Sequence, residues 1–372
     1  MASTSKPKVA HFVSGGGSGA TQAAVDLALG QAGRGNFDAL LVLRLKARRP
    51  VDRWVKEAEE AGVPVHLVPS GLKILTIFRL KRLFKRENVS VAVCHGNSEH
   101  LWGRLAAIWA GVPVIFHWEQ NVERYTWLRL RLARWLQGHT TRTICVSEGV
   151  RQHLLNLGLQ EETLRVLHNI VDVNRYQPAA RPWLERQRDP VMVARWARQK
   201  DYPNLIRAFG LLREKGHKDL QLHLVGGGKG SQRNRGAALV RALGLSEAVV
   251  IHGRREDIPD FLGRHRIFIL STHYEGFALS LLEAMAAGCC VIGTRSPGVD
   301  ELIRDGENGL LVPAGDSHAL AEAMDRLLTD DAAAERMAAR GTEGVLRDFT
   351  RDKWVSDFEK ELFQVLPSRQ SR

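Results

Sequence analysis

The sequence has few cysteines, and their spacing does not suggest either a metal site or a disulfide framework. Its four cysteines lie in apolar stretches without C-x-x-C spacing, at Cys94, Cys145, Cys289 and Cys290. A small secreted protein stabilised by disulfides is therefore excluded, and reduced cysteines are typical of the cytoplasm. We predict a cytoplasmic protein.

Long hydrophobic runs are also missing. The first residues, MASTSKPKVAHFV, contain too short an apolar run for a signal peptide. No stretch of about 18 uncharged apolar residues is present to span a bilayer. The longest candidate, LAAIWAGVPVIF, is typical of a helix end, a turn and a strand. We therefore expect neither a secretion signal nor a transmembrane helix.

Length and charge indicate two unlike halves. At 372 residues the chain is too long for one ordinary core, and 44% hydrophobic with 25% charged residues is typical of globular domains. Residues 1–175 carry 24 lysines and arginines against 14 acidic residues, a net charge of +10, and residues 176–372 carry 29 against 27, a net of +2. A nucleic acid, an anionic membrane or a phosphorylated substrate would each explain the basic first half.

Apolar, β-rich runs alternate with segments of helical spacing along the chain. The first half contains KVAHFV, ALLVLR, VAVCHG, VPVIFHW and TICVS, and the second contains PVMVARW, LQLHLVGGG, AVVIHG, IFILS and CCVIGT. This is the βαβ alternation of a parallel sheet, present twice. We predict an α/β protein with two doubly wound, Rossmann-like domains, whose parallel sheets face each other across a ligand cleft at the carboxyl ends of the strands.

Domain boundaries are predicted from a proline-containing segment. YQPAARPWLERQRDP, residues 176–190, has three prolines and mixed charge, which is typical of a linker. We therefore expect domains at residues 1–175 and 191–350. A C-terminal helix over about residues 352–368 is expected to pack back on the first domain.

A glycine-rich loop, SGGGSGATQAAVDLALG at residues 14–30, follows the first apolar run. Gly15, Gly17 and Ala20 satisfy the G-x-G-x-x-G/A pattern of a dinucleotide-binding turn. Arg44 ends the next apolar run, where the 2′-phosphate of NADP would bind. Glycines let the backbone approach a ligand, and the following helix offers N–H groups to an anion. An NADP-dependent oxidoreductase is therefore one candidate function.

A second motif, STHYEGFALSLLEAMAAGCCVIGT, spans residues 271–294. Glu275 lies in a loop after a predicted strand, and Glu283 follows about two turns into a helix that begins near Phe277 or Ala278. The backbone N–H groups of residues 277–279 can bind a phosphate, and the two carboxylates can accept hydrogen bonds from sugar hydroxyls. The motif suits a sugar joined to a nucleoside diphosphate, and the alternative is an acidic surface loop before an ordinary amphipathic helix.

This second motif resembles the E-x7-E signature of the retaining glycosyltransferases of family 4, which have the GT-B fold. The resemblance extends over nearly the whole chain. VARWARQKDYPNLIRAF is similar to the family's strand, Arg-x4-Lys and helix element, VLHNIVDVNRYQP to its N-G-V-D connector, and IRDGENGLLVPAGD to its late loop.

The resemblance implies roles for individual residues. Arg195 and Lys200 would contact the donor diphosphate, while Glu275 would contact the transferred sugar. Glu283 would hold the ribose, and His117, in VIFHWEQN, would lie near the 6-position of the donor sugar. The predicted catalytic residues are Glu275, His117, Arg195 and Lys200. The other predicted donor-binding residues are Gly16, Gly17, Arg254, Gly276, Phe277, Ala278, Leu279 and Glu283.

Three further expectations follow from the comparison with the family pattern. Ile170 follows Asn169 where the family has glycine, so the turn there differs. Ala278 stands where the family usually has glycine, which crowds the sugar pocket. Arg44 is expected to be a solvated charge at a strand end.

The residue inventory indicates catalysis without a metal ion or cofactor. There is no D-x-D motif, and no group of His, Asp and Glu has the sequence spacing of a metal site. Arg195, Lys200 and the helix N-terminus would therefore offset the charge of the departing diphosphate. The resemblance implies retention of configuration through front-face attack, in which the leaving phosphate takes the acceptor proton and no enzymatic nucleophile is needed.

Two helices of the basic half suggest a membrane surface. In RYTWLRLRLARWLQ, Trp127 and Leu130 are predicted to lie beside arginines, opposite the arc Tyr125, Leu128, Leu132, Trp135 and Leu136. In ILTIFRLKRLFKRE, the basic face carries Arg79, Lys81, Arg82, Lys85 and Arg86, opposite Ile77, Leu80 and Phe84. The alternative for both is an ordinary amphipathic helix with a solvated basic side.

We therefore predict a retaining, metal-independent glycosyltransferase on the cytoplasmic face of a membrane. Its partners would be a nucleotide-sugar donor, supplying a hexose or N-acetylhexosamine, a glycan or lipid-linked acceptor, and an anionic membrane surface. Envelope polysaccharide or lipopolysaccharide synthesis is the expected setting. The alternatives are the NADP-dependent oxidoreductase and a basic nucleic-acid-binding protein. The chain has no recognisable nucleic-acid-binding module, so no nucleic acid is expected as a partner.

Overall fold

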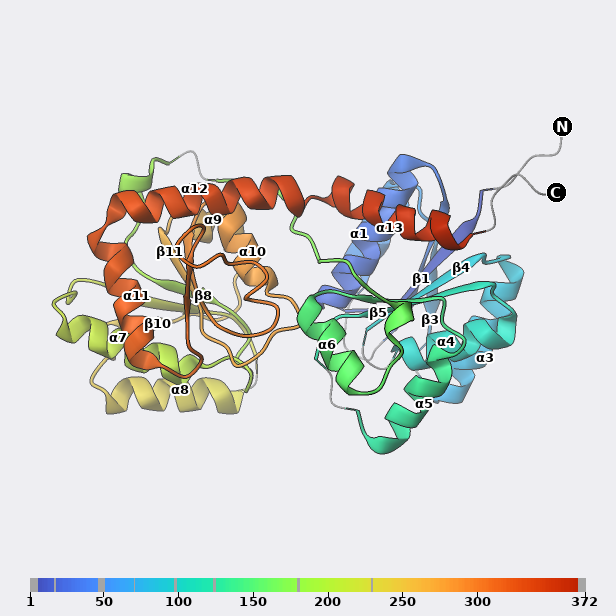
Figure 1. The fold of residues 1–372 in the computed structure, drawn as a ribbon, viewed down its shortest axis with the longest axis horizontal. Coiled ribbons are helices and arrows are strands. Elements are labelled where there is room, and N and C mark those ends of the chain that lie inside the picture. The colour runs from blue at the N-terminus through green and yellow to red at the C-terminus, as the bar shows by residue number, and fades with distance from the viewer. Residues whose placement is uncertain are drawn as a thin grey trace. The chain divides into compact units, whose positions relative to one another are not determined.

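The computed structural model describes residues 6–16, 18–45, 51–69, 71–96, 99–122, 125–178, 181–228 and 230–366. The chain divides into two compact units (Figure 1). Unit 1 comprises residues 1–169 and 351–372, and unit 2 comprises residues 170–350. Each unit contains one parallel sheet with helices on both faces, so the predicted α/β class with two doubly wound sheets is confirmed.

The sheet of unit 1 has seven strands in the order β3-β2-β1-β4-β5-β6-β7. The order reverses between β1 and β4, which is the switch point where doubly wound folds bind ligands. The strands are β1 (Lys8–Ser14), β2 (Asp38–Arg44), β3 (Val65–Val68), β4 (Val91–His95), β5 (Val114–Glu119), β6 (Arg142–Cys145) and β7 (Leu164–Val166).

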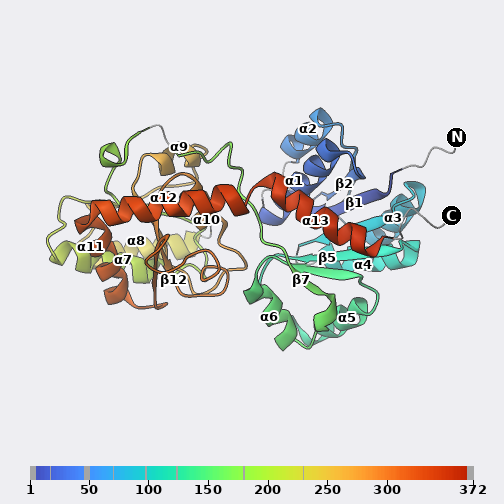
Figure 2. The same cartoon turned by 45° about the horizontal axis from the view of Figure 1, so that its top comes forward.

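Two hydrophobic clusters attach helices to the two faces of this sheet, because successive side chains of a strand point to opposite faces. Phe12 of β1 belongs to the cluster with helices α3 (Lys73–Arg86) and α4 (Glu99–Ala110). Val13, the next residue, belongs to the cluster with α1 (Gly19–Arg34) and α2 (Asp52–Glu60). Helices α5 (Trp127–Gln137) and α6 (Glu148–Asn156) lie on the opposite side of the sheet from α1 and α2 (Figure 2).

The C-terminal helix α13 (Arg351–Val365) packs on α1 within unit 1. The two helices touch at Gly30, where a Cβ would lie 2.4 Å from Val355 Cγ2. Two ion pairs flank this contact, Arg34 with Glu359 at 2.9 Å and Arg351 with Asp26 at 2.6 Å. The last turns of the chain therefore complete the unit that begins with β1.

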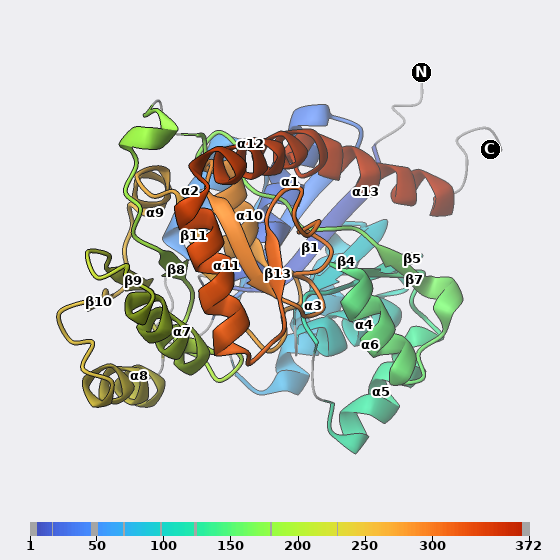
Figure 3. The ribbon, with the colours of Figure 1, turned by 60° about the vertical axis from the view of Figure 1, so that its left-hand side comes forward.

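The sheet of unit 2 has six strands in the order β10-β9-β8-β11-β12-β13, with its switch point between β8 and β11. Helix α7 packs against both α8 and α11, and α10 packs against α12 (Figure 3). The strands are β8 (Val191–Val193), β9 (Leu222–Val225), β10 (Val249–Ile251), β11 (Ile267–Leu270), β12 (Cys290–Thr294) and β13 (Leu310–Val312). The helices are α7 (Tyr202–Glu214), α8 (Gly230–Ala242), α9 (Ile258–Gly263), α10 (Leu279–Ala286), α11 (Ser317–Thr329) and α12 (Asp331–Asp348).

The segment predicted as a linker, residues 176–190, is a packed part of unit 2, which begins at Ile170. Trp183 is buried, and the buried guanidinium of Arg186 donates hydrogen bonds to the carbonyl oxygens of Ala287 and Gly288 at 3.3 and 2.9 Å. The linker prediction was therefore wrong. The proline and charge content of the segment indicated irregular structure. It gave no information on whether this segment packs against the rest of unit 2.

Across the described ranges, no helix combines the length and apolar character that crossing a bilayer requires.

Candidate active site

The loops at the carboxyl edge of the unit 2 sheet are joined by backbone hydrogen bonds. Lys200, after β8, forms an isolated antiparallel bridge with Thr272, after β11. The N–H of Asp201 donates to the carbonyl of Ser271 at 2.9 Å, and the N–H of His273 donates to that of Gln199 at 2.8 Å. The two loops that carry Lys200 and the E-x7-E motif are thus held in a fixed register.

The turn after β9 lies directly against the loop after β8. A Cβ at Gly226, which has a φ of +145°, would lie 2.0 Å from the carbonyl oxygen of Ala194. A Cβ at Gly228, with a φ of +144°, would lie 2.6 Å from the backbone nitrogen of Trp196. Only glycine permits this approach and this backbone conformation. The close packing fixes the backbone on either side of Arg195.

Arg195 and Arg254 are exposed side chains near this glycine turn. Arg195 follows β8, and the Cβ of Arg254 lies 3.9 Å from the position of a Cβ at Gly227. Both guanidinium groups are accessible to a ligand at the carboxyl edge of the sheet. Arg255, in contrast, forms an ion pair with Asp257 at 2.6 Å.

Lys200 and Glu275 form a buried ion pair, with side chains 10% and 8% exposed. The hydroxyl of Thr272 donates to the same carboxylate at 2.9 Å. Two of the predicted catalytic residues, 75 residues apart in sequence, are therefore brought into direct contact. This places a fixed positive charge and a fixed acceptor group next to each other.

The start of α10 differs from the prediction. Ala278 is the N-cap residue, and its N–H donates to the carbonyl of Gly298 at 3.3 Å. The N–H of Leu279 donates to the carbonyl of Phe277 at 2.9 Å. The prediction that the N–H groups of residues 277–279 are open to a phosphate is therefore wrong for Ala278 and Leu279. The cationic side chains in the loop after β8 include Lys200, which pairs with Glu275, and Arg195, which is exposed.

Gly298 accounts for the position of this loop. It has a φ of +79°, and a Cβ there would lie 2.9 Å from the carbonyl oxygen of Gly276 and 3.0 Å from that of Glu275. The loop after β12 therefore supports the backbone on which Glu275 stands.

Glu283 lies in α10 and receives a hydrogen bond from the hydroxyl of Tyr176. Burial raises the pKa of the Glu283 carboxyl to about 7, although Tyr176 and the charge of Arg175 act to lower it. Tyr176 lies in the connector motif and at the start of the predicted linker, and neither feature indicated this contact. Tyr176 and Glu283 are more than 100 positions apart, and no sequence pattern connects them.

In unit 1, the glycine-rich loop is a tight turn between β1 and α1. The N–H of Gly15 donates to the carbonyl of Arg44 at 2.8 Å, and a Cβ at Gly15 would lie 2.5 Å from Val51 Cγ1. Gly16 has a φ of +122°, and Ser18 caps α1 by accepting a hydrogen bond from the N–H of Thr21. The predicted donor-binding residue Gly17 lies outside the described residues.

Arg44 is not a solvated strand-end charge, so that expectation was wrong. Its side chain is only 14% exposed, and its Nη1 lies 2.8 Å from the carboxylate of the buried Glu99. A buried carboxylate needs a partner, which accounts for the position of this arginine. The NADP hypothesis required the Arg44 guanidinium to bind a 2′-phosphate. In the structure, this guanidinium is paired with Glu99 instead.

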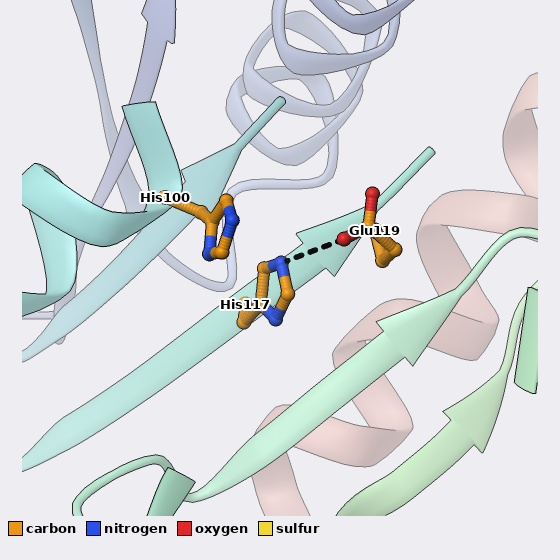
Figure 4. A group of neighbouring side chains, drawn as sticks. All are labelled: His100, His117 and Glu119. Carbon is orange, nitrogen blue, oxygen red and sulfur yellow. Dashed lines mark ion pairs between the residues drawn. The ribbon is translucent and has the colours of Figure 1, made fainter. Parts of the chain in front are cut away.

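His117 belongs to a buried polar cluster that the sequence did not reveal (Figure 4). His117 and Glu119 lie on β5, and His100 lies in the first turn of α4. The rings of His100 and His117 stack at 4.1 Å, and His117 Nε2 lies 3.5 Å from Glu119 Oε2. One possible metal-ligating atom of each residue lies within 4.8 Å of the others. Sequence spacing had predicted no such group, because α4 and β5 bring the residues together only in the fold.

Most polar atoms of this cluster already have partners. Arg104 donates to His100 Nδ1 at 2.9 Å, and the hydroxyl of Tyr125 donates to Glu119 at 3.0 Å. Glu119 also accepts a hydrogen bond from the N–H of Gln120. A guanidinium in contact with His100 disfavours a bound cation. The cluster therefore suits a hydrogen-bonding role better than metal binding.

Both ring nitrogens of His117 lack a hydrogen-bond partner among the described residues. Burial, assisted by the charge of Arg104, holds the pKa of His117 well below its usual range. The ring is therefore neutral and offers one donor and one acceptor. A buried ring without a hydrogen bond, whose Nε2 lies 3.5 Å from the Glu119 carboxylate, is chemically suited to hydrogen-bond a ligand hydroxyl.

Comparison with known proteins shows the family to which this chain belongs. Residues 17–175 match the family model described as Glycosyltransferase Family 4, and residues 176–344 match the model described as Glycosyl transferases group 1. A protein with two parallel Rossmann-like domains and these two matches is a GT-B glycosyltransferase. The chain belongs to the family 4-like glycosyltransferases, and the predicted family, fold and enzyme class are confirmed.

The chain is similar to two curated bacterial glycosyltransferases along most of its length. It is 28% identical to the lipopolysaccharide core biosynthesis glycosyltransferase LpsE of Rhizobium meliloti, over 97% of this chain and 100% of the relative. It is also 28% identical to the putative glycosyltransferase EpsD of Bacillus subtilis, over 78% of this chain and 81% of the relative. The crystal structure of Anabaena HepE in complex with UDP superposes with a TM-score of 0.82 and 18% identity, covering 96% of this chain and all of that one.

Proposed function

We propose that the protein transfers a hexose or N-acetylhexosamine from a nucleoside diphosphate sugar to a glycan or lipid-linked acceptor, with retention of configuration and without a metal ion. The observation that carries this proposal is the Lys200–Glu275 pair at the carboxyl edge of the unit 2 sheet, in which Lys200 comes from the loop that also carries the exposed Arg195. The lipopolysaccharide core function of LpsE and the UDP bound to HepE support it. We place the enzyme in lipopolysaccharide or envelope polysaccharide synthesis, on the cytoplasmic face of the membrane.

In the proposed reaction, the bond between the anomeric carbon and the diphosphate breaks as the acceptor oxygen bonds to the same face of the sugar. The acceptor proton passes to the leaving phosphate, so no enzymatic nucleophile is required. Arg195 and Lys200 stabilise the negative charge that develops on the diphosphate. Arg254 contacts the base side of the donor.

The remaining site residues position the sugar and the ribose in this proposal. Glu275, fixed by Lys200, accepts hydrogen bonds from hydroxyls of the transferred sugar. Glu283 accepts hydrogen bonds from the ribose. The neutral ring of His117 contacts the donor sugar, as the family resemblance implies.

Nucleotide release in EDTA tests the proposed function. The full chain is incubated with UDP-, GDP-, ADP- and dTDP-linked hexoses and a truncated lipopolysaccharide acceptor, and the freed nucleoside diphosphate is measured. We expect acceptor-dependent release from one donor class, unchanged by excess EDTA, because two side-chain cations replace a metal ion. Loss of release in EDTA that manganese or magnesium restores would contradict the metal-free mechanism.

Donor affinity is expected to rise with pH through the pKa of Glu283. The ribose hydroxyls donate to the ionised carboxylate, and a pKa of about 7 makes that form about tenfold more abundant at pH 8 than at pH 6. The dissociation constant of a nucleotide sugar should therefore fall by about tenfold across this interval. Because the pKa is raised in the folded state, the contribution of Glu283 to folding stability should be lost as the pH rises from about 4.5 to about 7.

Two variants separate this effect from general changes of the protein. Tyr176→Phe removes a hydrogen bond that favours the ionised carboxylate, so the midpoint should move to higher pH. Glu283→Gln should remove the pH dependence and weaken binding at every pH. A wild-type affinity that stays constant from pH 6 to 8 would show that the Glu283 carboxylate does not contact the donor.

A further inference from the structure

Helices α3, α4 and α5 form one layer of unit 1, with α4 in contact with both of its neighbours (Figure 1). The inner side of this layer is packed, as predicted for α3, where Ile77, Leu80 and Phe84 are buried. We call the outward side of the three helices, together with the N-cap residue Leu72, the α3–α5 face. Its charge and its exposed apolar side chains are both unusual.

The charge of the α3–α5 face has a single sign. Helices α3 and α5 contain no acidic residue, and the one acidic residue of α4, Glu99, is buried in its ion pair with Arg44. Arg86 pairs with Glu87 beyond the end of α3. The basic residues of α3 and α5 are Lys73, Arg79, Lys81, Arg82, Lys85, Arg86, Arg129, Arg131 and Arg134. A face of this composition repels other cationic surfaces and attracts anionic ones.

The same face exposes large apolar side chains. Fourteen large hydrophobic residues are exposed among the described residues, and eight of them belong to this face. They are Leu72, Ile74, Leu75, Phe78, Trp109, Trp127, Leu128 and Trp135. Phe78 and Trp109 come from different helices, and their ring centroids are 5.7 Å apart, so the patch is continuous across α3 and α4. An exposed apolar surface shared by α3 and α4, with further exposed apolar side chains on α5, marks an interaction site.

The helical projection of α5 was only partly right. Trp127 is 66% exposed as predicted, but Leu128 and Trp135 are also exposed, and Leu130 is half-buried. The helix buries a narrow stripe of Ala133, Leu136 and Gln137 instead of the broad arc expected. The exposed apolar area of α5 is therefore larger than the sequence indicated.

We propose that the α3–α5 face docks on an anionic lipid bilayer. Tryptophan, phenylalanine and leucine side chains enter the interfacial region, while the surrounding lysines and arginines contact lipid phosphates. A nucleic acid would satisfy the charge but would leave the aliphatic side chains in water. The inference deepens the proposed function, and it rests on that function for the membrane-anchored acceptor that such docking would serve.

Vesicle sedimentation of the full chain tests this docking. With phosphatidylglycerol–phosphatidylcholine vesicles, the protein should pellet at low salt and be released at high salt, because the Debye length shortens from about 10 Å at 0.1 M to about 3 Å at 1 M. Vesicles of phosphatidylcholine alone should bind at least tenfold less. Failure to pellet with anionic vesicles at low salt, or equal binding to both compositions, overturns the proposal.

Two variants of the face should each weaken vesicle binding by at least tenfold. One removes apolar side chains, Phe78→Ser with Trp109→Ser and Trp127→Ser. The other removes charge, Arg82→Gln with Lys85→Gln and Arg131→Gln. A matched control in unit 2 removes three exposed arginines of α8, Arg233→Gln, Arg235→Gln and Arg241→Gln, and should bind vesicles as the wild type does.

Folding and function are followed separately in the same proteins. All six substituted side chains of the face are exposed, so the unfolding temperatures should match that of the wild type. Nucleotide release with a soluble acceptor should also be unchanged in both variants. Vesicle binding without any nucleotide release would contradict the proposed function and would still support docking on the bilayer. Wild-type vesicle binding by both variants, or binding to soluble polyglutamate in preference to vesicles, overturns the docking.

Discussion

Replacement of Lys200 by methionine is expected to lower kcat/KM for sugar transfer by about 10²- to 10³-fold, the loss typical when a fixed group that stabilises developing charge is removed. The ammonium group is buried and held by Glu275, so it costs little reorganisation when the diphosphate departs. Methionine keeps the length and the packing of the side chain and removes only its charge. A variant that retains kcat/KM within threefold of the wild type would show that Lys200 does not contact the reacting phosphate.

The same replacement should destabilise the fold, because it leaves Glu275 buried without its cation. Breaking a buried ion pair by removing one partner costs about 3 to 5 kcal/mol. Adding Glu275→Gln to Lys200→Met should restore most of the unfolding free energy, measured by urea denaturation, but not the activity. Recovery of the unfolding free energy in the double variant would assign the destabilisation by Lys200→Met to the uncompensated Glu275 carboxylate.

Replacement of Arg195 by alanine is expected to lower kcat/KM by about 10- to 150-fold without changing stability. A hydrogen bond between charged groups contributes about 1.5 to 3 kcal/mol, and each 1.4 kcal/mol corresponds to about tenfold. The side chain is exposed, so its loss should leave the unfolding temperature unchanged.

Arg198 provides the matched control for Arg195. It is also exposed, lies three residues further along the same loop, and has no predicted role in donor binding. Steady-state kinetics of Arg195→Ala and Arg198→Ala should therefore differ by at least tenfold. Equal kcat/KM values in the two variants would show that Arg195 does not contact the donor diphosphate.

The fold was predictable because parallel strands that are buried on both faces consist of continuous apolar runs of residues. KVAHFV and CCVIGT, for example, overlap β1 and β12 closely. The E-x7-E motif also predicted the helix that carries Glu283, with its start displaced by only one or two residues. These features depend on local patterns, which a single sequence contains.

Contacts between distant segments were not predictable in the same way. The cluster of His100, His117 and Glu119 exists because the first turn of α4 lies against β5, and no spacing in the sequence records that. Arg44 was taken for a solvated charge because its partner Glu99 lies 55 residues away. Both of these cases concern charged or polar groups whose partners are set by tertiary packing.

Motif similarity named the residues of the proposed donor site one by one, but it did not predict how these residues pair with one another. Motif similarity named Lys200 and Glu275 as ligands of different parts of the donor, and it gave no reason to expect an ion pair between them. The same holds for Glu283 and Tyr176. A sequence motif contains no information on the contacts that its residues make with one another in the fold.

Calorimetric titration of nucleoside diphosphates into the full chain in EDTA measures directly whether Arg195 and Lys200 bind the donor diphosphate. We expect UDP, GDP, ADP or dTDP to bind as one molecule per chain. Arg195→Ala and Lys200→Met should each weaken that binding at least tenfold, and Arg198→Ala should not. If none of the four nucleotides binds, or if the nucleotide that binds does so equally well in all three variants, the donor site assigned to unit 2 is wrong.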